Sequence, residues 1–176
     1  MIQKLSLTSD QVEILYLREV LNSDKVYDAI RQGDFPAAVL DGNTFLDAFQ
    51  FLIAAQIATL NARRGKLVTH DVFSEIVFSL SARKNVREAF STFGFQSSSK
   101  NAVVVLVNPD PNTKESVLKR ISCAEMLETN EDMVKYCNIQ DLMQLYQIEQ
   151  QELLESTLLD AVITRIATKI VNNSHI

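Results

Sequence analysis

The sequence predicts an α+β domain in which a small, mainly antiparallel or mixed β-sheet is surrounded by several helices and followed by a long C-terminal helix. Two observations predict this fold class. Helix patterns outnumber strand patterns, and residues 102–107 form a continuous apolar run rich in β-branched residues, typical of a central strand buried on both faces. The 176 residues contain no repeat and no low-complexity linker, so we predict one domain over residues 1–176 with about three to five strands.

The first half of the chain alternates between short strand patterns and helix patterns. Strands are expected at residues 12–17 and 37–40, and helices at residues 22–32, 44–64, 70–80 and 85–92. Gly33, Gly65 and Gly94 follow three of these helices, as glycine commonly does at helix ends. Asp41-Gly42 is a turn signal that separates the second strand from the next helix.

The second half begins with the predicted central strand. The Asn-, Pro- and Asp-rich run 108–112 stops that strand, and residues 122–127 are ambiguous, with an edge strand as one interpretation. Short helices are expected at residues 113–121, 130–137 and 140–146, and the last helix is expected from about Gln150 to Ile170 or Val171.

Composition favours an intracellular chain without disulfides or metal. Apolar residues make up 47% of the sequence, enough for a core that needs no cross-link, so Cys123 and Cys137 are predicted to be free thiols. Two cysteines and two histidines far apart give no metal-ligand spacing. The N-terminus has no signal-peptide pattern, and the apolar stretch 49–60 is too short and too polar to span a membrane. A cytoplasmic and nuclear location is expected.

Charge is distributed unevenly along the chain. The net charge is −5, but residues 61–100 contain seven Lys/Arg against three Asp/Glu, whereas residues 109–160 contain four against eleven. The simpler interpretation is two solvated faces. The alternative is a basic patch that binds an anion and an acidic region that avoids it.

No catalytic pattern and no cofactor site is apparent. The four glycines stand alone, so there is no phosphate-binding loop, and no serine has a nucleophile-elbow pattern around it. His70 is more easily explained as a surface residue at a helix start than as a general base. Glu75 and Asp160, each within an apolar helix pattern, are the alternatives for a small enzyme, although capping or hydrogen-bonding roles are favoured. The chain is therefore predicted to bind macromolecular partners and to catalyse nothing itself.

Three stretches together resemble a known family. They are FLDAFQFLIAA (residues 45–55), SEIVFSLS with NVREAF and FGF (74–81, 85–90 and 93–95), and LLDAVITRIATK (158–169). In this order and spacing they resemble the TPRKB-type kinase-binding small subunit of the KEOPS complex, also called EKC. The resemblance implies a non-catalytic subunit that binds the small atypical kinase of the complex directly and the threonylcarbamoyl transferase through that kinase. It further implies help in presenting the single-stranded CCA end of tRNA for threonylcarbamoyl-adenosine modification.

An apolar stripe on the last helix is the predicted kinase interface. Its members recur at spacings of four, three and four, and the helix has more apolar surface than one face needs. They are Leu159, Ile163, Ile166 and Ile170. The first half of the helix is expected to be buried, and the second half, close to the chain end, to be exposed.

Basic residues near two helix ends are the predicted tRNA-binding surface. They are Arg63, Arg64, Lys66, His70, Arg83, Lys84 and Arg87. Phe73 or Phe78 is a candidate stacking platform for bases, with core packing as the favoured role of both. Val68 and His70 stand where the family carries basic residues, so a kinase-binding scaffold without direct tRNA contact is the alternative.

Overall fold

A computed structural model of the chain describes residues 2–127 and 134–171, with side chains up to residue 169. Five strands, seven α-helices and two short 3₁₀ turns lie within these ranges. The strands are β1 (Ile2–Lys4), β2 (Gln11–Val20), β3 (Ala38–Asp41), β4 (Ala102–Val107) and β5 (Cys123–Leu127). The α-helices are α1 (Ser23–Arg31), α2 (Ala48–Arg63), α3 (Val72–Leu80), α4 (Val86–Phe93), α5 (Pro111–Arg120), α7 (Ile139–Tyr146) and α8 (Leu158–Val171). The 3₁₀ turns are η1 (Gly42–Thr44) and η2 (Glu152–Leu154).

All strand pairs of the sheet are antiparallel. The order is β1-β2-β4-β3, and β5 also pairs with β2. β1 lies opposite residues 11–13 of β2 and β5 lies opposite residues 16–20, so the two short strands share one edge of the long strand. The predicted fold class is thereby confirmed, with β4 in the interior and β5 as an edge strand.

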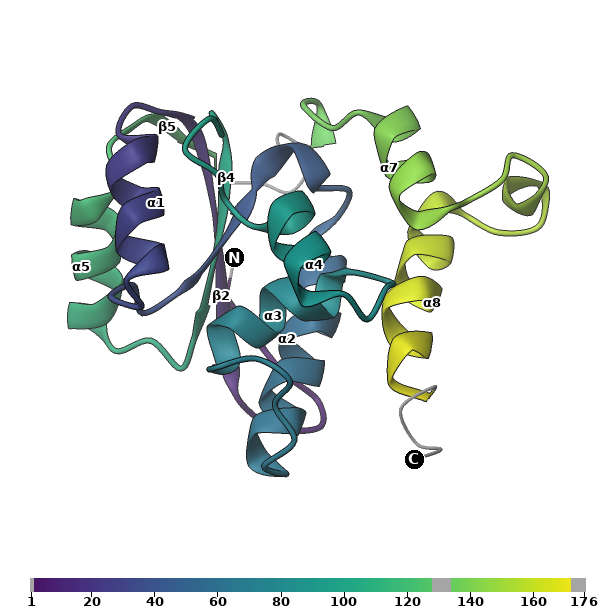
Figure 1. Cartoon of the computed structure of the whole chain (residues 1–176), viewed down its shortest axis with the longest axis horizontal. Helices are drawn as coiled ribbons and strands as arrows, with labels where there is room; N and C mark the ends of the chain where they lie inside the picture. The colour runs from purple at the N-terminus through teal and green to yellow at the C-terminus, as the bar shows by residue number, and fades with distance from the viewer. Residues whose placement is uncertain (1, 128–133, 172–176) are drawn as a thin grey trace.

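Two apolar clusters cover the two faces of the sheet. Successive side chains of a strand point to opposite faces, so Val103 and Val105 of β4 join one cluster and Val104 and Leu106 join the other. Helices α1 and α5 cover the face of Val104, whereas α2, α3 and α4 cover the face of Val103 (Figure 1). Helices α7 and α8 form a further layer beyond α2 and α3 (Figure 1).

Helix α2 is the central helix of the larger cluster. It begins at Ala48, about one turn later than predicted, because Asp47 and Gln50 form a capping box, and residues 42–44 before it form the short turn η1. Nine of its sixteen residues are buried, since the sheet, α3 and α8 all pack against it. Small side chains at Ala54, Ala55 and Ala58 allow these neighbours to approach closely.

The C-terminal helix is shorter than predicted. The sequence predicts one helix from about Gln150, whereas η2 ends at Leu154 and α8 begins at Leu158. Thr157 explains the break: its Oγ1 accepts a hydrogen bond from the Asp160 N–H at 3.1 Å and donates to Asp160 Oδ2 at 2.7 Å, which caps α8. Strand β1, three exposed residues, was not predicted, and the first half of the expected helix 130–137 lies outside the described residues.

Two buried hydrogen bonds attach the C-terminal layer to the end of α3. The Tyr146 hydroxyl of α7 donates to the Leu80 carbonyl at 3.0 Å, and the Lys169 ammonium of α8 donates to the Phe78 carbonyl. The last carbonyls of a helix lack partners within it and carry partial negative charge, so a hydroxyl and a cation satisfy them well. Among the described residues, no helix is long and apolar enough to cross a membrane.

Candidate functional site

The predicted basic residues fall into two groups at opposite ends of α3. Arg63 and Arg64 end α2, and Lys66 and His70 lie in the loop before α3. Arg83, Lys84 and Arg87 lie between α3 and the first turn of α4. Because α3 has nine residues and is about 13 Å long, the two groups do not form one compact patch.

Two of these charges are paired with carboxylates within the chain. Arg63 donates to the buried Asp10 carboxylate at 2.9 Å, and Arg83 is paired with Glu88. Burial alone would raise the pKa of Asp10, but hydrogen bonds from Asn108, Thr8 and Arg63 hold it below its ordinary value. In the group between α2 and α3, the cations that remain for a ligand are therefore mainly Arg64 and Lys66, with His70 in the same loop.

Glu75 fixes the loop that carries Lys66 and His70. Its side chain is buried, and its Oε1 accepts a hydrogen bond from Asn61 Nδ2 at 3.0 Å. Its Oε2 accepts three more, from the N–H groups of Val68 and Thr69 at 3.0 and 2.9 Å and from the Thr69 hydroxyl at 2.8 Å. A carboxylate occupied in this way supports the structural interpretation of Glu75 over the catalytic one.

Asp160 also has a structural explanation. It is exposed, and its carboxylate and backbone N–H are both engaged with Thr157 at the start of α8. Among the described residues, no group of three His, Cys, Asp or Glu side chains is arranged to hold a metal ion, and Cys123 and Cys137 are free thiols.

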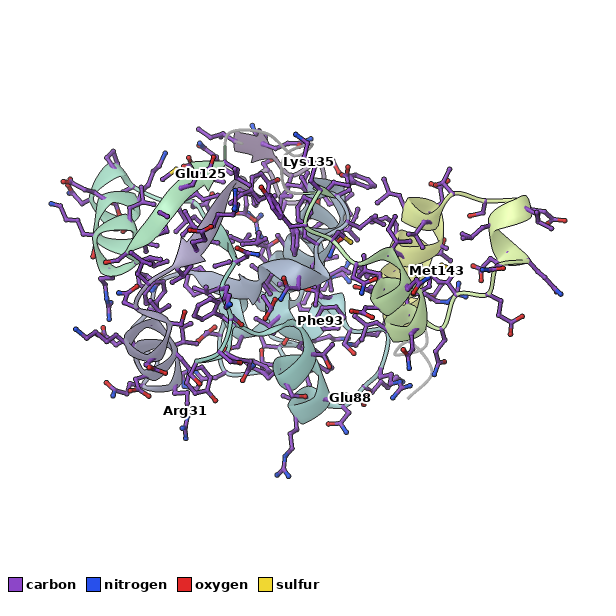
Figure 2. The ribbon with its side chains drawn as sticks, turned by 90° about the horizontal axis from the view of Figure 1, so that it is seen from above. Arg31, Glu88, Phe93, Glu125, Lys135 and Met143 are labelled. Carbon is purple, nitrogen blue, oxygen red and sulfur yellow. The ribbon has the colours of Figure 1, made fainter. Side chains whose placement is uncertain are left out.

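A groove of about 620 Å³ opens between α1, β3, α3 and α4. Its lining combines cationic, aromatic and polar groups. It includes Arg31, His70, Phe73, Phe90, Ser91 and Gln96. Figure 2 shows Arg31 of α1 and Glu88 of α4 on the same side of the molecule. Neither the groove nor the role of Arg31 was predicted, because nothing local in the sequence indicates that α1 and α4 flank the edge of β3.

Phe73 and Phe78 have different environments. Phe73 lies at the start of α3, where it is half-buried against the larger cluster and lines the groove with its remaining surface. Phe78 is buried under α8, with the Lys169 Nζ 3.3 Å from its ring centroid. Of the two candidate stacking platforms, only Phe73 is suitably placed.

The predicted apolar stripe of α8 is divided between core and surface. Leu159 and Ile163 are half-buried, whereas Ile166 is fully buried and belongs to the larger core cluster. The assignment of Ile166 to an interface was therefore wrong, because the second half of α8 packs on α2 and the end of α3. The side chain of Ile170 lies outside the described residues.

Lys169 is a buried cation that was not predicted from the sequence. It stands in the last turn of α8, and burial lowers its pKa to about 8, although the charge of Glu75 acts in the opposite direction. Its position three residues after Ile166 on the inward face is the only sequence signal for this burial. The ammonium and the ring of Phe78 together attach α8 to α3.

Comparison with known proteins gives consistent matches over most of the chain. The family described as "Kinase binding protein CGI-121" matches residues 17–170. A zebrafish protein named "EKC/KEOPS complex subunit TPRKB" is 30% identical over 88% of this chain and 89% of its own length. Two fungal proteins are named as CGI121 subunits of the EKC/KEOPS complex. The one from Yarrowia lipolytica is 25% identical over 78% of this chain and 80% of its own length. The one from Aspergillus fumigatus is 28% identical over 89% of this chain and 90% of its own length.

Proposed function

This chain belongs to the kinase binding protein CGI-121 family, and on that premise we propose that it is a non-catalytic subunit of an EKC/KEOPS complex that binds the kinase of that complex. The observation that carries the proposal is the family match over residues 17–170, nearly the whole described chain. The structure adds an outer layer, α7 and α8, where Leu159 and Ile163 keep exposed apolar surface. Exposed apolar surface on one layer of a domain is typical of a protein-binding face.

Ile163→Arg tests the kinase interface. Ile163 is half-buried, so an arginine can turn toward solvent in the free chain, whereas in a complex it would place an unpaired charge at a desolvated contact. The variant should lose co-purification with the KEOPS kinase subunit and keep the melting temperature of the wild type. Leu21→Arg, at an exposed residue after β2, is the matched control. If Ile163→Arg binds the kinase as well as the wild type does, this face of α8 is not part of the interface.

A second candidate function is contact with the CCA end of tRNA. The loop with Lys66 and His70 borders a groove that also contains Arg31 and Phe73, and cations beside an aromatic ring suit single-stranded nucleic acid. Glu75 holds this loop in one conformation, which favours binding without further ordering of the backbone. We propose that this groove receives the tRNA end while the kinase occupies the α8 side.

Reversal of two charges tests the tRNA proposal. Arg64→Glu combined with Lys66→Glu, in the assembled complex, should weaken binding to intact tRNA and reduce the salt slope by roughly 0.7 for each lost phosphate contact to a single strand. Lys119→Glu on α5, across the sheet, is the control. If neither the charge reversal nor removal of the CCA end weakens tRNA binding, the alternative of a kinase-binding scaffold without tRNA contact is favoured.

A further inference from the structure

We propose that residues 147–157, here termed the knob, present Leu154 to an apolar pocket with a basic rim on the partner kinase. Arg165 acts as the positioning residue that holds the knob in place. This inference rests on the proposed function, because the kinase is the partner that the family description names. It goes beyond the α8 stripe, since the knob lies between α7 and α8 and contains none of the predicted interface residues.

Leu154 is the first observation. It is 85% exposed, the highest value among the large hydrophobic side chains of the described residues, while its neighbour Leu153 packs against the core. The knob stands away from the body of the molecule, as the yellow-green turn after α7 in Figures 1 and 2. A leucine at the end of a projection can enter a concave site that a flat helix face cannot reach.

The conformation of the knob is fixed, which is the second observation. Glu152 and Arg165 of α8 form a two-point ion pair, with Oε1 to Nη1 at 2.9 Å and Oε2 to Nη2 at 2.7 Å. The Leu154 N–H donates to the Gln151 carbonyl at 3.2 Å within η2, and Gln147 adopts a left-handed conformation with φ of 53° where the chain leaves α7. A backbone held in its binding geometry loses little entropy on association.

Charge identifies the chemistry of the partner surface. Residues 149–160 contain Glu149, Glu152, Glu155 and Asp160 and no Lys or Arg. Within the described chain, Glu149 and Glu155 make no ion pair, so their charges are available to a partner. An apolar tip surrounded by carboxylates fits a hydrophobic pocket ringed by Lys or Arg. Helix α8 follows directly, so Leu159 and Ile163 extend the proposed contact.

Affinity for the purified KEOPS kinase subunit, measured by calorimetry with the full chain, tests the role of Leu154. Leu154→Ala should weaken binding at least about tenfold, as truncation of a central interface residue does. Leu21→Ala, at a leucine that is 74% exposed elsewhere, should leave affinity unchanged. Both variants should have the melting temperature of the wild type, because neither side chain contributes to the core. Glu149→Lys combined with Glu155→Lys should slow association several-fold at low salt with little change in dissociation.

A double-mutant cycle tests Arg165. Arg165→Lys keeps the charge but loses the two-point geometry, so it should weaken binding several-fold in the wild type and have no effect when Leu154 is already Ala. A purely structural role would give the same loss in both backgrounds and would overturn the positioning claim.

Three outcomes separate the inference from the proposed function. If Leu154→Ala binds normally while Ile163→Arg does not, the knob is outside the interface and the proposed function stands. If the wild type does not bind the kinase at all, the proposed function itself fails. If the wild type forms a dimer in sedimentation that Leu154→Ala dissociates, the knob contacts a second copy of the chain and the inference is overturned.

Discussion

Replacing Lys169 with Met should remove a rise in stability with pH that the structure assigns to this buried lysine. Burial lowers the pKa of Lys169 to about 8 from its ordinary value of 10.5. The folded chain therefore releases this proton at a lower pH than the unfolded chain does. Between these two pKa values the unfolded state binds more protons, so the free energy of unfolding increases with pH across that window. The contribution is complete above 10.5 and is lost as the pH falls through 8.

The size of the effect follows from the two pKa values of Lys169. One unit of pKa corresponds to about 1.4 kcal/mol, and integration of the linkage relation from about pH 7 to about pH 9.5 gives a gain of about 2 kcal/mol. In a chain of this length, a change of about 2 kcal/mol corresponds to a shift of roughly 4–8 °C in melting temperature.

Urea unfolding of both proteins at the two pH values measures the effect as a difference. Met fills the space of the lysine stem and packs well against the ring of Phe78, whose carbonyl still accepts a hydrogen bond from the Ser81 N–H. Burial raises the pKa values of Cys123 and Cys137, which acts in the opposite direction, and subtraction of the variant cancels it. The free energy of unfolding of the wild type minus that of the variant should be larger at the higher pH. If this difference is the same at both pH values, the ammonium of Lys169 is not desolvated in the folded chain.

Three further predictions concern the core and the loop before α3. Ile166→Ala should destabilise the chain by about 2–5 kcal/mol in urea unfolding, because it opens a cavity in the larger cluster. A loss below about 1 kcal/mol would show that the Ile166 side chain is not part of the core. Glu75→Ala should leave the donors of Val68 and Thr69 unpaired, so their amides should exchange with deuterium at least several-fold faster; unchanged exchange would show that another group holds the loop. Tyr146→Phe should cost about 1 kcal/mol in thermal unfolding through the hydrogen bond it loses, and an unchanged melting temperature would show that this bond is not formed in solution.

The elements were predictable where one local pattern determines them. Residues 102–107 were predicted as a central strand and form β4 with the same bounds, because a run of valines has few alternatives to a strand buried on both faces. The start of α8 was not predicted, because the apolar spacing continues through residues 150–157. There a single hydroxyl, that of Thr157, determines where the helix begins. Strand β1 is exposed and depends on pairing with β2, which no local pattern indicates.

The candidate site was less predictable, because its properties depend on distant residues. The sequence identifies Arg63 as a cation, but it does not show that Asp10, far earlier in the chain, neutralises it. The spacing of Ile166 fits an exposed stripe as well as it fits the core. Only the packing of α8 on α2 decides between them. The groove beside Arg31 exists because α1, β3, α3 and α4 meet there, and this is a property of the tertiary structure.

The position of β4 in the middle of the sheet has a consequence for biosynthesis. Val12 of β2 pairs with Val107 and Leu40 of β3 pairs with Val103, so both strands emerge from the ribosome long before the strand that joins them. Contacts between residues so distant in sequence form slowly. Until β4 has been synthesised, the unpaired edges of β2 and β3 can associate with other chains. A nascent chain arrested before residue 102 is therefore expected to be sensitive to protease and to bind chaperones. Emergence of the strand 102–107 allows β2 and β3 to pair with it, but full protease resistance should appear only after α7 and α8, which complete the larger cluster, have also emerged.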